Sequence, residues 1–297
     1  MKNLHAEITN KIIAQLQQGV VPWRKPWSGQ AIGTAMPRNA VTNRTYSGIN
    51  VMTLWGARDE KGYIDNKWLT YKQAAELGGN VRKGEKGEGI IYVNFIEKID
   101  EETGRKVKIP FLKSYTVFNV AQCDGLNLET TQPKILNNDE RDQLAEEFIK
   151  ATGADVRHGE SRAYYASGNR DFIMLPAFET FTGSDEYYST AFHELGHWTV
   201  HESRLNRVFG KRFGDTGYAA EELVAELTAA FACAEFGFNN LGNSACGTLG
   251  NSASYIDHWL EVLGKNERLI VEAAAKASKA VDYMRDQANA TALPIAA

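Results

Sequence analysis

The stretch AFHELGHWTV, residues 191–200, places the pattern His193-Glu194-Leu195-Gly196-His197 between apolar, helix-forming flanks. Two histidines four positions apart lie on one face of a helix, about one turn from each other, so both imidazoles can reach a single metal ion. Glu194 is rotated by about 100° from His193 and flanks that face, where it can polarise a metal-bound water. The pattern also recurs by chance in unrelated proteins, but its flanks and the strand predicted before it favour a metal site.

A zinc site of this kind needs a third protein ligand, and the segment YAAEELVAELTAAFACAEFG (218–237) offers Glu221, Glu222 and Glu226 as candidates. Glu222 and Glu226 are four positions apart and therefore share a helix face. We expect Glu222 to be the ligand and Glu226 to accept the outward N–H of a histidine, and the reverse assignment stays open. The expected cofactor is one divalent ion, with zinc favoured and manganese as the alternative. His201, one turn beyond His197, is expected to lie past the site.

Around this pattern, the sequence predicts a mainly helical domain with a short sheet over residues 139–297. Strand-like runs flank Ser167-Gly168-Asn169, and DFIMLP (171–176) is the stronger of the two. This strand is expected to offer an edge to which an extended peptide substrate could add. Apolar spacing and capping signals predict helices over 139–151, 185–203, 218–236, 253–263 and 267–288.

The first part of the chain has a different character, because residues 1–125 carry a net charge of +6 and residues 126–297 carry −10. We place a linker at 126–138, where the charge changes sign and Pro133 interrupts a stretch without clear period. A helix is expected over 8–18 and a short one over 70–77, with strands over 89–99 and 113–123. The fold class is therefore α+β, with a mixed N-terminal domain (1–125) built on a small antiparallel sheet.

The N-terminal domain interleaves aromatic and basic residues. Aromatic faces stack on unpaired bases while Lys and Arg neutralise phosphates, so this composition is typical of single-stranded DNA binding. The competing interpretation is that Trp55, Trp68 and Tyr92 are core residues and that the charges only solvate the surface. The domain has no phosphate-binding P-loop and no deaminase motif. The candidate DNA contacts are Trp23, Arg24, Lys25, Trp27, Arg38, Arg44, Tyr46, Lys67, Arg82, Lys83 and Lys86.

Composition excludes several other classes of protein. The chain has no apolar run of about 18 residues, which a membrane span would need, and its first residues lack the apolar core of a secretory signal. Three scattered cysteines are too few for a disulfide framework. We therefore expect a cytoplasmic protein with no membrane partner.

Several separated segments resemble ArdC-type antirestriction proteins. The first half does so in ITNKIIAQLQQGVVPWRKPW (8–27), GINVMTLW (48–55) and WLTYKQAAELGGNVRKGEKG (68–87), and the second half in DFIMLP, HELGHWT, SRLNR (203–207) and YAAEELVAEL. The resemblance implies a single-stranded-DNA-binding domain followed by a zincin-like metallopeptidase domain. It also implies the metal role for His193 and His197 and the general-base role for Glu194. The order of Glu222 and Glu226 is similar to that of gluzincin-like enzymes, which favours Glu222 as the ligand.

The function implied by the resemblance is protection of incoming conjugative plasmid DNA from host restriction endonucleases. Its partner would be single-stranded DNA, with a restriction enzyme or another DNA-bound protein as a further target. The alternative is a zinc-dependent endopeptidase that DNA recruits to its protein substrates. A DNA-mimicking inhibitor would need a strongly acidic exposed body, and the cationic first half argues against it.

Overall fold

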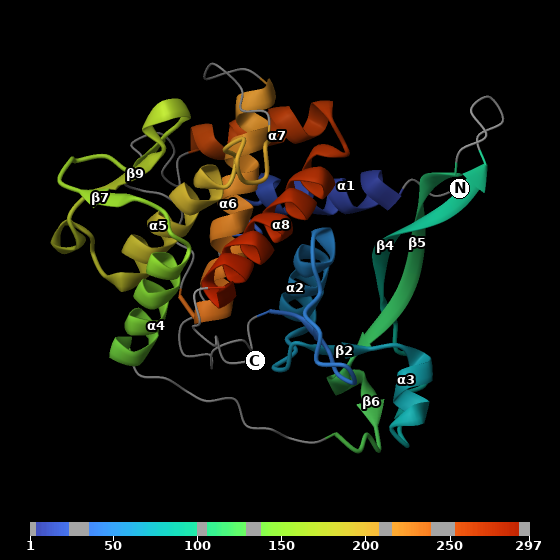
Figure 1. Cartoon of the computed structure of the whole chain (residues 1–297). Coiled ribbons are helices and arrows are strands. Elements are labelled where there is room, and N and C mark those ends of the chain that lie inside the picture. The colour runs from blue at the N-terminus through green and yellow to red at the C-terminus, as the bar shows by residue number, and fades with distance from the viewer. Residues whose placement is uncertain are drawn as a thin grey trace. The chain divides into compact units, whose positions relative to one another are not determined.

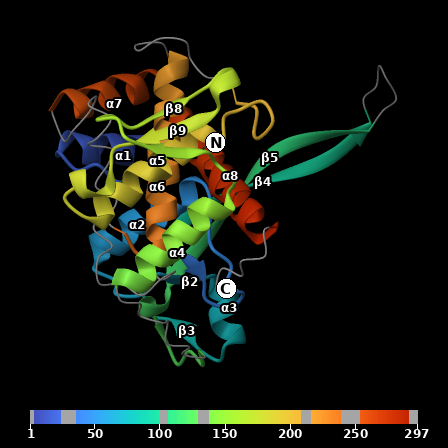
Figure 2. The ribbon, with the colours of Figure 1, turned by 60° about the vertical axis from the view of Figure 1, so that its left-hand side comes forward.

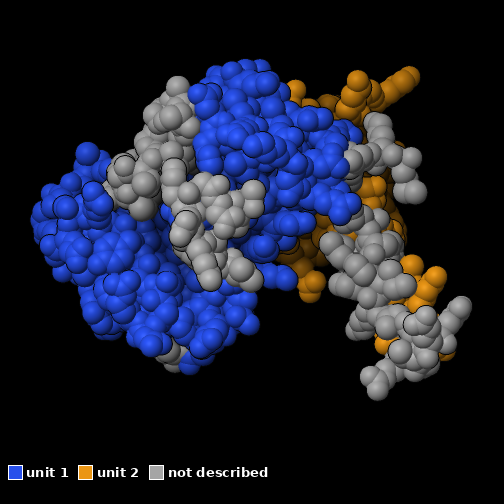
Figure 3. Space-filling view, turned by 90° about the horizontal axis from the view of Figure 1, so that it is seen from above, with its two compact units in different colours: residues 1–36, 132–297 blue, residues 37–131 orange. Residues whose placement is uncertain are grey.

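The computed structural model describes residues 4–23, 36–99, 106–128, 138–207, 216–238 and 253–290. The chain forms two compact units, coloured separately in Figure 3: unit 1 comprises residues 1–36 and 132–297, and unit 2 comprises residues 37–131. The α+β class is confirmed, because unit 1 is mainly helical and unit 2 combines helices with a small sheet. The domain boundary differs from the expected one, since the first 36 residues join the C-terminal unit. Among the described residues, no helix has the length and apolar character that crossing a membrane requires.

Unit 1 is built around helix α6 (Thr216–Phe236), which lies among other helices of the unit (Figure 1) and is buried along most of its length. In this helix, α6, every residue from Leu223 to Ala234 is buried, which is typical of a helix enclosed by others. Helices α5 and α8 pack along it. The helices of the unit are α1 (Leu4–Gln17), α4 (Asn138–Ala151), α5 (Ser184–Trp198), α6 (Thr216–Phe236), α7 (Ala253–Lys265) and α8 (Leu269–Ala290).

The helix α1 belongs to this core because of its apolar stripe. Ile8, Ile12 and Leu16 recur at helical spacing and are buried, and α1 packs against α7 and α8. The hydroxyl of Thr9 donates a hydrogen bond of 2.6 Å to the carbonyl oxygen of Glu267. Residues near the N-terminus thus complete the C-terminal unit, which charge and composition could not indicate.

A three-stranded sheet accompanies the helices of unit 1 (Figure 2). Its strands are β7 (Val156–His158), β8 (Tyr164–Ala166) and β9 (Phe172–Leu175), in the order β7-β9-β8. Strand β9 is parallel to β7 and antiparallel to β8, so both of its edges are already paired. The expectation that residues 171–176 offer a free edge to a peptide is therefore wrong. Short 3-10 turns, Gly168–Arg170 and Phe178–Thr180, follow β8 and β9.

Unit 2 packs helix α2 (Ile49–Lys61) on a four-stranded sheet with the order β1-β2-β5-β4. Its core contains Leu54, Trp68, Ile90 and Val117. Strands β4 and β5 continue as a long two-stranded ribbon (Figure 1). The remaining elements of unit 2 are β1 (Arg38–Asn39), β2 (Lys67–Leu69), α3 (Tyr71–Glu76), β3 (Asn80–Val81), β4 (Glu88–Ile99), β5 (Lys106–Asn119), the 3-10 turn Val120–Gln122 and β6 (Cys123–Asp124).

Two predicted elements run past the ends that the structure shows, and the helix expected over 8–18 begins earlier, at Leu4. The strand expected over 113–123 is β5, which begins at Lys106 and stops at Asn119, because the Asn119 side chain caps a 3-10 turn there. The helix expected over 185–203 is α5, which ends at Trp198. Two arginines of the following turn form hydrogen bonds with carbonyl groups in the last turn of α5. Arg204 donates to the carbonyl oxygen of Trp198 and Arg207 to that of Gly196.

Candidate metal centre

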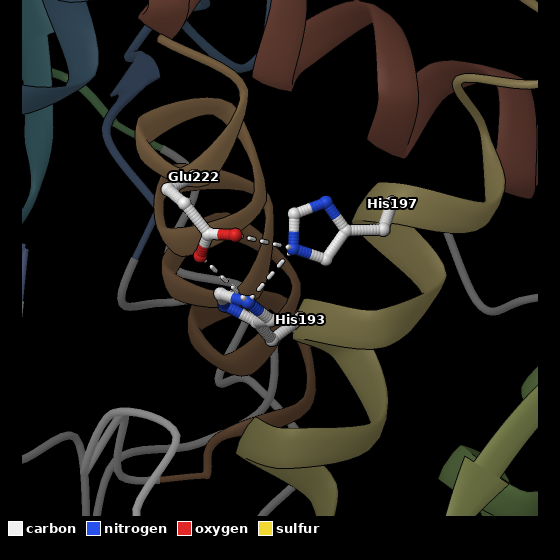
Figure 4. A group of neighbouring side chains, drawn as sticks. All are labelled: His193, His197 and Glu222. Carbon is white, nitrogen blue, oxygen red and sulfur yellow. Dashed lines mark hydrogen bonds and ion pairs between the residues drawn. The ribbon is translucent and has the colours of Figure 1, made fainter. Parts of the chain in front are cut away.

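Helices α5 and α6 bring two imidazoles and one carboxylate to the same point (Figure 4). The Nε2 atoms of His193 and His197 are 3.1 Å apart. The carboxylate of Glu222 reaches across from α6, with one oxygen 3.6 Å from His193 Nε2 and the other 3.5 Å from His197 Nε2. Among the described residues this is the one cluster of histidine, cysteine, aspartate and glutamate side chains that could hold an ion.

The spacing of these atoms fits a tetrahedral ion. Bonds of about 2.0–2.1 Å in a tetrahedral zinc site place the ligand atoms about 3.3 Å from one another. The three separations above lie within a few tenths of an ångström of that value. The ligand set, two imidazole nitrogens and one carboxylate oxygen, is also one that zinc accepts with a fourth position left open. His193, His197 and Glu222 therefore fit a divalent ion, and both histidines would bind it through Nε2.

The glycine between the two histidines allows the helices to approach closely. A Cβ atom placed on Gly196 would lie 3.0 Å from Cα of Ala225 and 3.2 Å from Cβ of Thr228, both on α6. Such distances are shorter than normal contacts, so even a Cβ at position 196 would require these atoms of α6 to give way by a few tenths of an ångström. The glycine of the HELGH segment thus lets Glu222 come within reach of the histidines.

The site is buried and strongly charged. His193 and His197 are almost inaccessible, and Glu222 is more open. Burial alone would lower the pKa of His197, but the nearby carboxylates, Glu222 foremost, outweigh it and raise that pKa well above its usual value. Burial would raise the pKa of Glu222, but the two histidines hold it well below its usual range. The carboxylates and imidazoles of the cluster thus stabilise each other's charged forms, and a cation placed among them would compete with protons for the same atoms.

A second carboxylate stands behind His197. Glu221 has one oxygen 3.9 Å from His197 Nδ1, on the side of the ring that faces away from the cluster. The guanidinium of Arg207 donates to both oxygens of Glu221, at 3.0 and 2.5 Å. Sequence analysis assigned no role to Glu221 or Arg207. The segment SRLNR (203–207), which ends at Arg207, was the one available signal. Spacing in the sequence could not show which carboxylate Arg207 binds.

Glu194 and Glu226, the other two acids predicted for the site, are both buried. Glu194 lies in α5 beside His193, and its charge contributes to the raised pKa of His197. Glu226 lies one turn beyond Glu222 on α6 and is not part of the cluster that the described ligand atoms form. His201 lies in the turn after α5, where its Nδ1 is 2.8 Å from the hydroxyl of Ser203.

The predicted DNA contacts fall into different environments. Arg24, Lys25 and Trp27 lie outside the described residues. Trp23 is fully buried and packs edge-on against Trp259 of α7, at 6.1 Å between ring centroids. Its assignment as a surface ring rather than a core ring was therefore wrong.

Tyr46 is also a core residue, packed with Leu54 and Trp68. Burial raises its pKa to about 12. Neither Tyr46 nor Trp23 presents a ring face to solvent in this structure. Trp55 and Trp68 are buried as the competing interpretation predicted, whereas Tyr92 is 44% exposed and does not belong to the core.

The predicted cations are mostly accessible, but they are not equivalent. Arg82 bonds to Glu85 and Asp124 and thereby holds its own turn together. Arg38 on β1 lies opposite Lys67 on β2, so two half-buried cationic side chains share one face of the sheet. Three further cations are exposed: Arg44, Lys83 and Lys86.

The structure adds an aromatic pair that sequence reasoning missed. Tyr92 of β4 and Tyr115 of β5 meet edge to face, with ring centroids 5.6 Å apart, and are 44% and 38% exposed. The ammonium of Lys113 lies 5.0 Å from the centre of the Tyr115 ring. Tyr92 directly follows the buried Ile90 and Ile91, and Tyr115 lies in an exposed stretch (113–116), so the pattern of apolar residues did not distinguish this pair.

Comparison with protein-family models matches both parts of the chain. Residues 2–118 match the N-terminal domain of anti-restriction factor ArdC, and residues 143–276 match a zincin-like metallopeptidase domain. The second match includes the whole cluster of His193, His197 and Glu222.

Two solved structures of the antirestriction ArdC protein from the R388 plasmid are similar to this chain. The metal-free structure is 41% identical, with a TM-score of 0.76, over 97% of this chain and 98% of that one. The Mn(II)-bound structure is 40% identical, with a TM-score of 0.75, over 96% and 98%. A manganese-bound relative and a zincin-like domain together support a divalent ion as the cofactor.

Similar sequences include the protein y4eC of Sinorhizobium fredii, which is 34% identical over 96% of this chain and 92% of that protein. Two proteins named DNA primase TraC from Escherichia coli are each 38% identical over 95% of this chain. The chain spans only 27% and 20% of the length of those two proteins. Since the ArdC structure and y4eC are matched over nearly their whole length, and both domains follow in the same order, the chain belongs to the ArdC family of antirestriction proteins, with a zincin-like domain in its second half.

Proposed function

We propose that this protein binds single-stranded DNA and protects incoming conjugative plasmid DNA from restriction endonucleases in the cytoplasm. The observation that carries the proposal is the match to ArdC, an antirestriction protein, over both domains at about 40% identity. The cationic character of the first part of the chain agrees with a polyanionic partner.

For DNA contact, unit 2 offers cations and exposed rings. Among the described residues, the side chains of Arg44, Lys67, Lys83 and Lys86 make no ion pair, so their charges are available to phosphates. Tyr92 and Tyr115 add accessible ring faces on which bases could stack. Because Trp23 and Tyr46 are core residues, we assign base stacking to this tyrosine pair instead.

For the metal centre, we propose that His193, His197 and Glu222 hold one divalent ion, with zinc favoured and manganese as the alternative. A bound ion would supply a Lewis acid that polarises a carbonyl group and makes a water molecule a better nucleophile. Glu194 follows the first ligand on the same buried helix, and its carboxylate would accept the proton from the attacking water. Glu226 would support a ligand by accepting a hydrogen bond from a histidine, or it would itself be the third ligand in place of Glu222.

Salt dependence tests the DNA-binding part of the proposal. Affinity for a fluorescent single-stranded oligonucleotide should fall steeply as salt rises, because each phosphate contact releases a counterion. Replacing Tyr92 and Tyr115 together by leucine should weaken binding by about 1–3 kcal/mol per stacked base, while Tyr71→Leu, at an exposed tyrosine elsewhere in unit 2, serves as the control. Affinity that does not change with salt would contradict a basic binding surface.

The second candidate function is a DNA-recruited endopeptidase, and the intact arrangement of His193, Glu194, His197 and Glu222 favours it. Glu194→Ala separates the two functions in an assay of DNA cleavage by a restriction enzyme. If the variant binds DNA and metal normally and still protects DNA, protection does not depend on hydrolysis. If protection disappears while binding survives, the protein protects DNA as a peptidase.

A further inference from the structure

The turn after α5 carries two arginines that make matching contacts with different consequences. Arg204 holds Asp171 through two bonds of 3.0 and 2.5 Å, and Arg207 holds Glu221 through two bonds of 3.0 and 2.5 Å. The two arginine side chains are equally buried, at 7% and 8% exposure. Only the carboxylate held by Arg207 also faces a residue of the metal cluster.

Arg207 is anchored by two further contacts. Its guanidinium donates to the hydroxyl of Thr199 and to the carbonyl oxygen of Gly196, both at 2.8 Å. Gly196 lies between the two histidines on α5, while Glu221 lies on α6. One rigid, planar group therefore joins the two helices that supply the metal ligands.

Glu221 lies on the side of His197 that the ion would not occupy. One of its oxygens is 3.9 Å from Nδ1, whereas Nε2 of the same ring faces His193 and Glu222. A carboxylate next to Nδ1 favours the tautomer with the proton on that nitrogen, and this tautomer leaves the lone pair of Nε2 for a metal. Glu221 thus faces Nδ1 of His197 as an ion-pair partner, from the side of the ring opposite the cluster.

We propose that Glu221, held in place by Arg207, is a positioning residue for His197. It fixes the orientation of the imidazole and keeps the proton on Nδ1, so that Nε2 is ready to bind the ion. This is the role that sequence reasoning gave to Glu226. The inference rests on the proposed metal centre.

The test compares two matched substitutions, Glu221→Gln and Asp171→Asn. Each replaces a carboxylate bound to an arginine of the same turn with an amide of equal size, but only the first lies beside a ligand. Zinc affinity is measured by competition with a chromophoric chelator, and the visible spectrum of the cobalt-substituted protein reports the geometry of the ligands. We expect Glu221→Gln to weaken zinc binding about 10–100-fold and to alter the cobalt bands, and Asp171→Asn to do neither.

Zinc affinity in Glu221→Gln equal to that of the unmodified protein would overturn the positioning role, as would an equal loss in Asp171→Asn. If Glu221→Gln does not fold, Arg207→Lys takes its place, because lysine keeps the charge but cannot hold both oxygens of Glu221. Weaker zinc binding by that variant supports the role, and unchanged binding overturns it. An unmodified protein that binds neither zinc nor manganese would overturn the metal centre itself, which is a different result.

Discussion

Trp23 illustrates at the residue scale how burial changes an assignment. The ring lies among core residues of unit 1 against Trp259, so its removal leaves a cavity rather than a weakened DNA contact. We expect Trp23→Ala to lower the free energy of unfolding by about 3–5 kcal/mol, measured by urea denaturation. The affinity for single-stranded DNA, measured under conditions where the variant is folded, should stay unchanged. Weaker DNA binding with unchanged stability would return Trp23 to the binding surface.

Asp171 provides a pH-dependent prediction at the same scale. The bonds from Arg204 hold the pKa of Asp171 below its usual range, and Tyr165 also donates to the carboxylate at 2.7 Å. A carboxylate whose pKa is lower in the folded state stabilises the protein at pH values above its unfolded pKa, and this stabilisation is lost as the pH falls through its folded pKa.

Asp171→Asn should therefore cost about 1.5–3 kcal/mol of stability at pH 7, the range for hydrogen bonds to a charged group. Well below pH 4 the carboxyl group is protonated in both folded and unfolded protein, so the difference between the two proteins should shrink. The measurement is urea unfolding of metal-free protein at both pH values. A difference of equal size at both would show that the charge of Asp171 contributes nothing.

The site residues differ in how well sequence could predict them. The spacing of His193 and His197 fixes a shared helix face, and the structure places Glu222 with them. The pairing of Arg207 with Glu221 depends on how the chain returns from α5 to α6, which no local pattern encodes. Tyr46 was misjudged because an aromatic residue beside cations has the same sequence signature whether its ring packs inward or outward.

At the scale of elements, the approach of α5 to α6 decides whether the metal ligands can meet. We expect Gly196→Val to separate the helices, to destabilise the protein by about 1–3 kcal/mol through overpacking, and to weaken zinc binding at least as much as Glu221→Gln. Gly264→Val, in α7, is the control, because a Cβ at Gly264 meets nothing within 4 Å. Unchanged zinc affinity in Gly196→Val would show that close helix packing is not required.

The elements themselves were predictable to the extent that they are long and periodic. Helices α4, α6, α7 and α8 lie within two residues of their expected bounds, because their apolar residues follow a clear helical period. The three residues of β7, Val156–His158, are too few to show an alternating pattern and were missed. The end of α5 was missed because it is capped by side chains further along the chain. Arg204 and Arg207 donate hydrogen bonds to its last carbonyl groups.

For the whole molecule, the place of α1 makes the first residues part of the metal-binding unit. A chain that lacks residues 1–23 should expose the apolar surface that Ile8, Ile12 and Leu16 cover, so unit 1 should unfold at a lower temperature. Differential scanning calorimetry would follow the transition that shifts upward when zinc is added, which identifies unit 1. An unaltered transition would contradict the assignment of α1 to this unit.

The division of the chain could be predicted from composition only in part. The change in charge and the separate motifs indicated two parts with different tasks. The crossing of residues 1–36 into unit 1 was not predictable, because an amphipathic helix shows that it has an apolar face but not which partner covers that face.

The proposed chemistry of this protein depends on an ion between α5 and α6, and anomalous X-ray diffraction from crystals grown with zinc or manganese tests for that ion most directly. We expect one anomalous peak, at about 2.0–2.2 Å from Nε2 of His193, Nε2 of His197 and one carboxylate oxygen of Glu222. A peak bound by Glu226 in place of Glu222 would reverse the ligand assignment. No peak near the two histidines, in protein saturated with either metal, would contradict the metal centre.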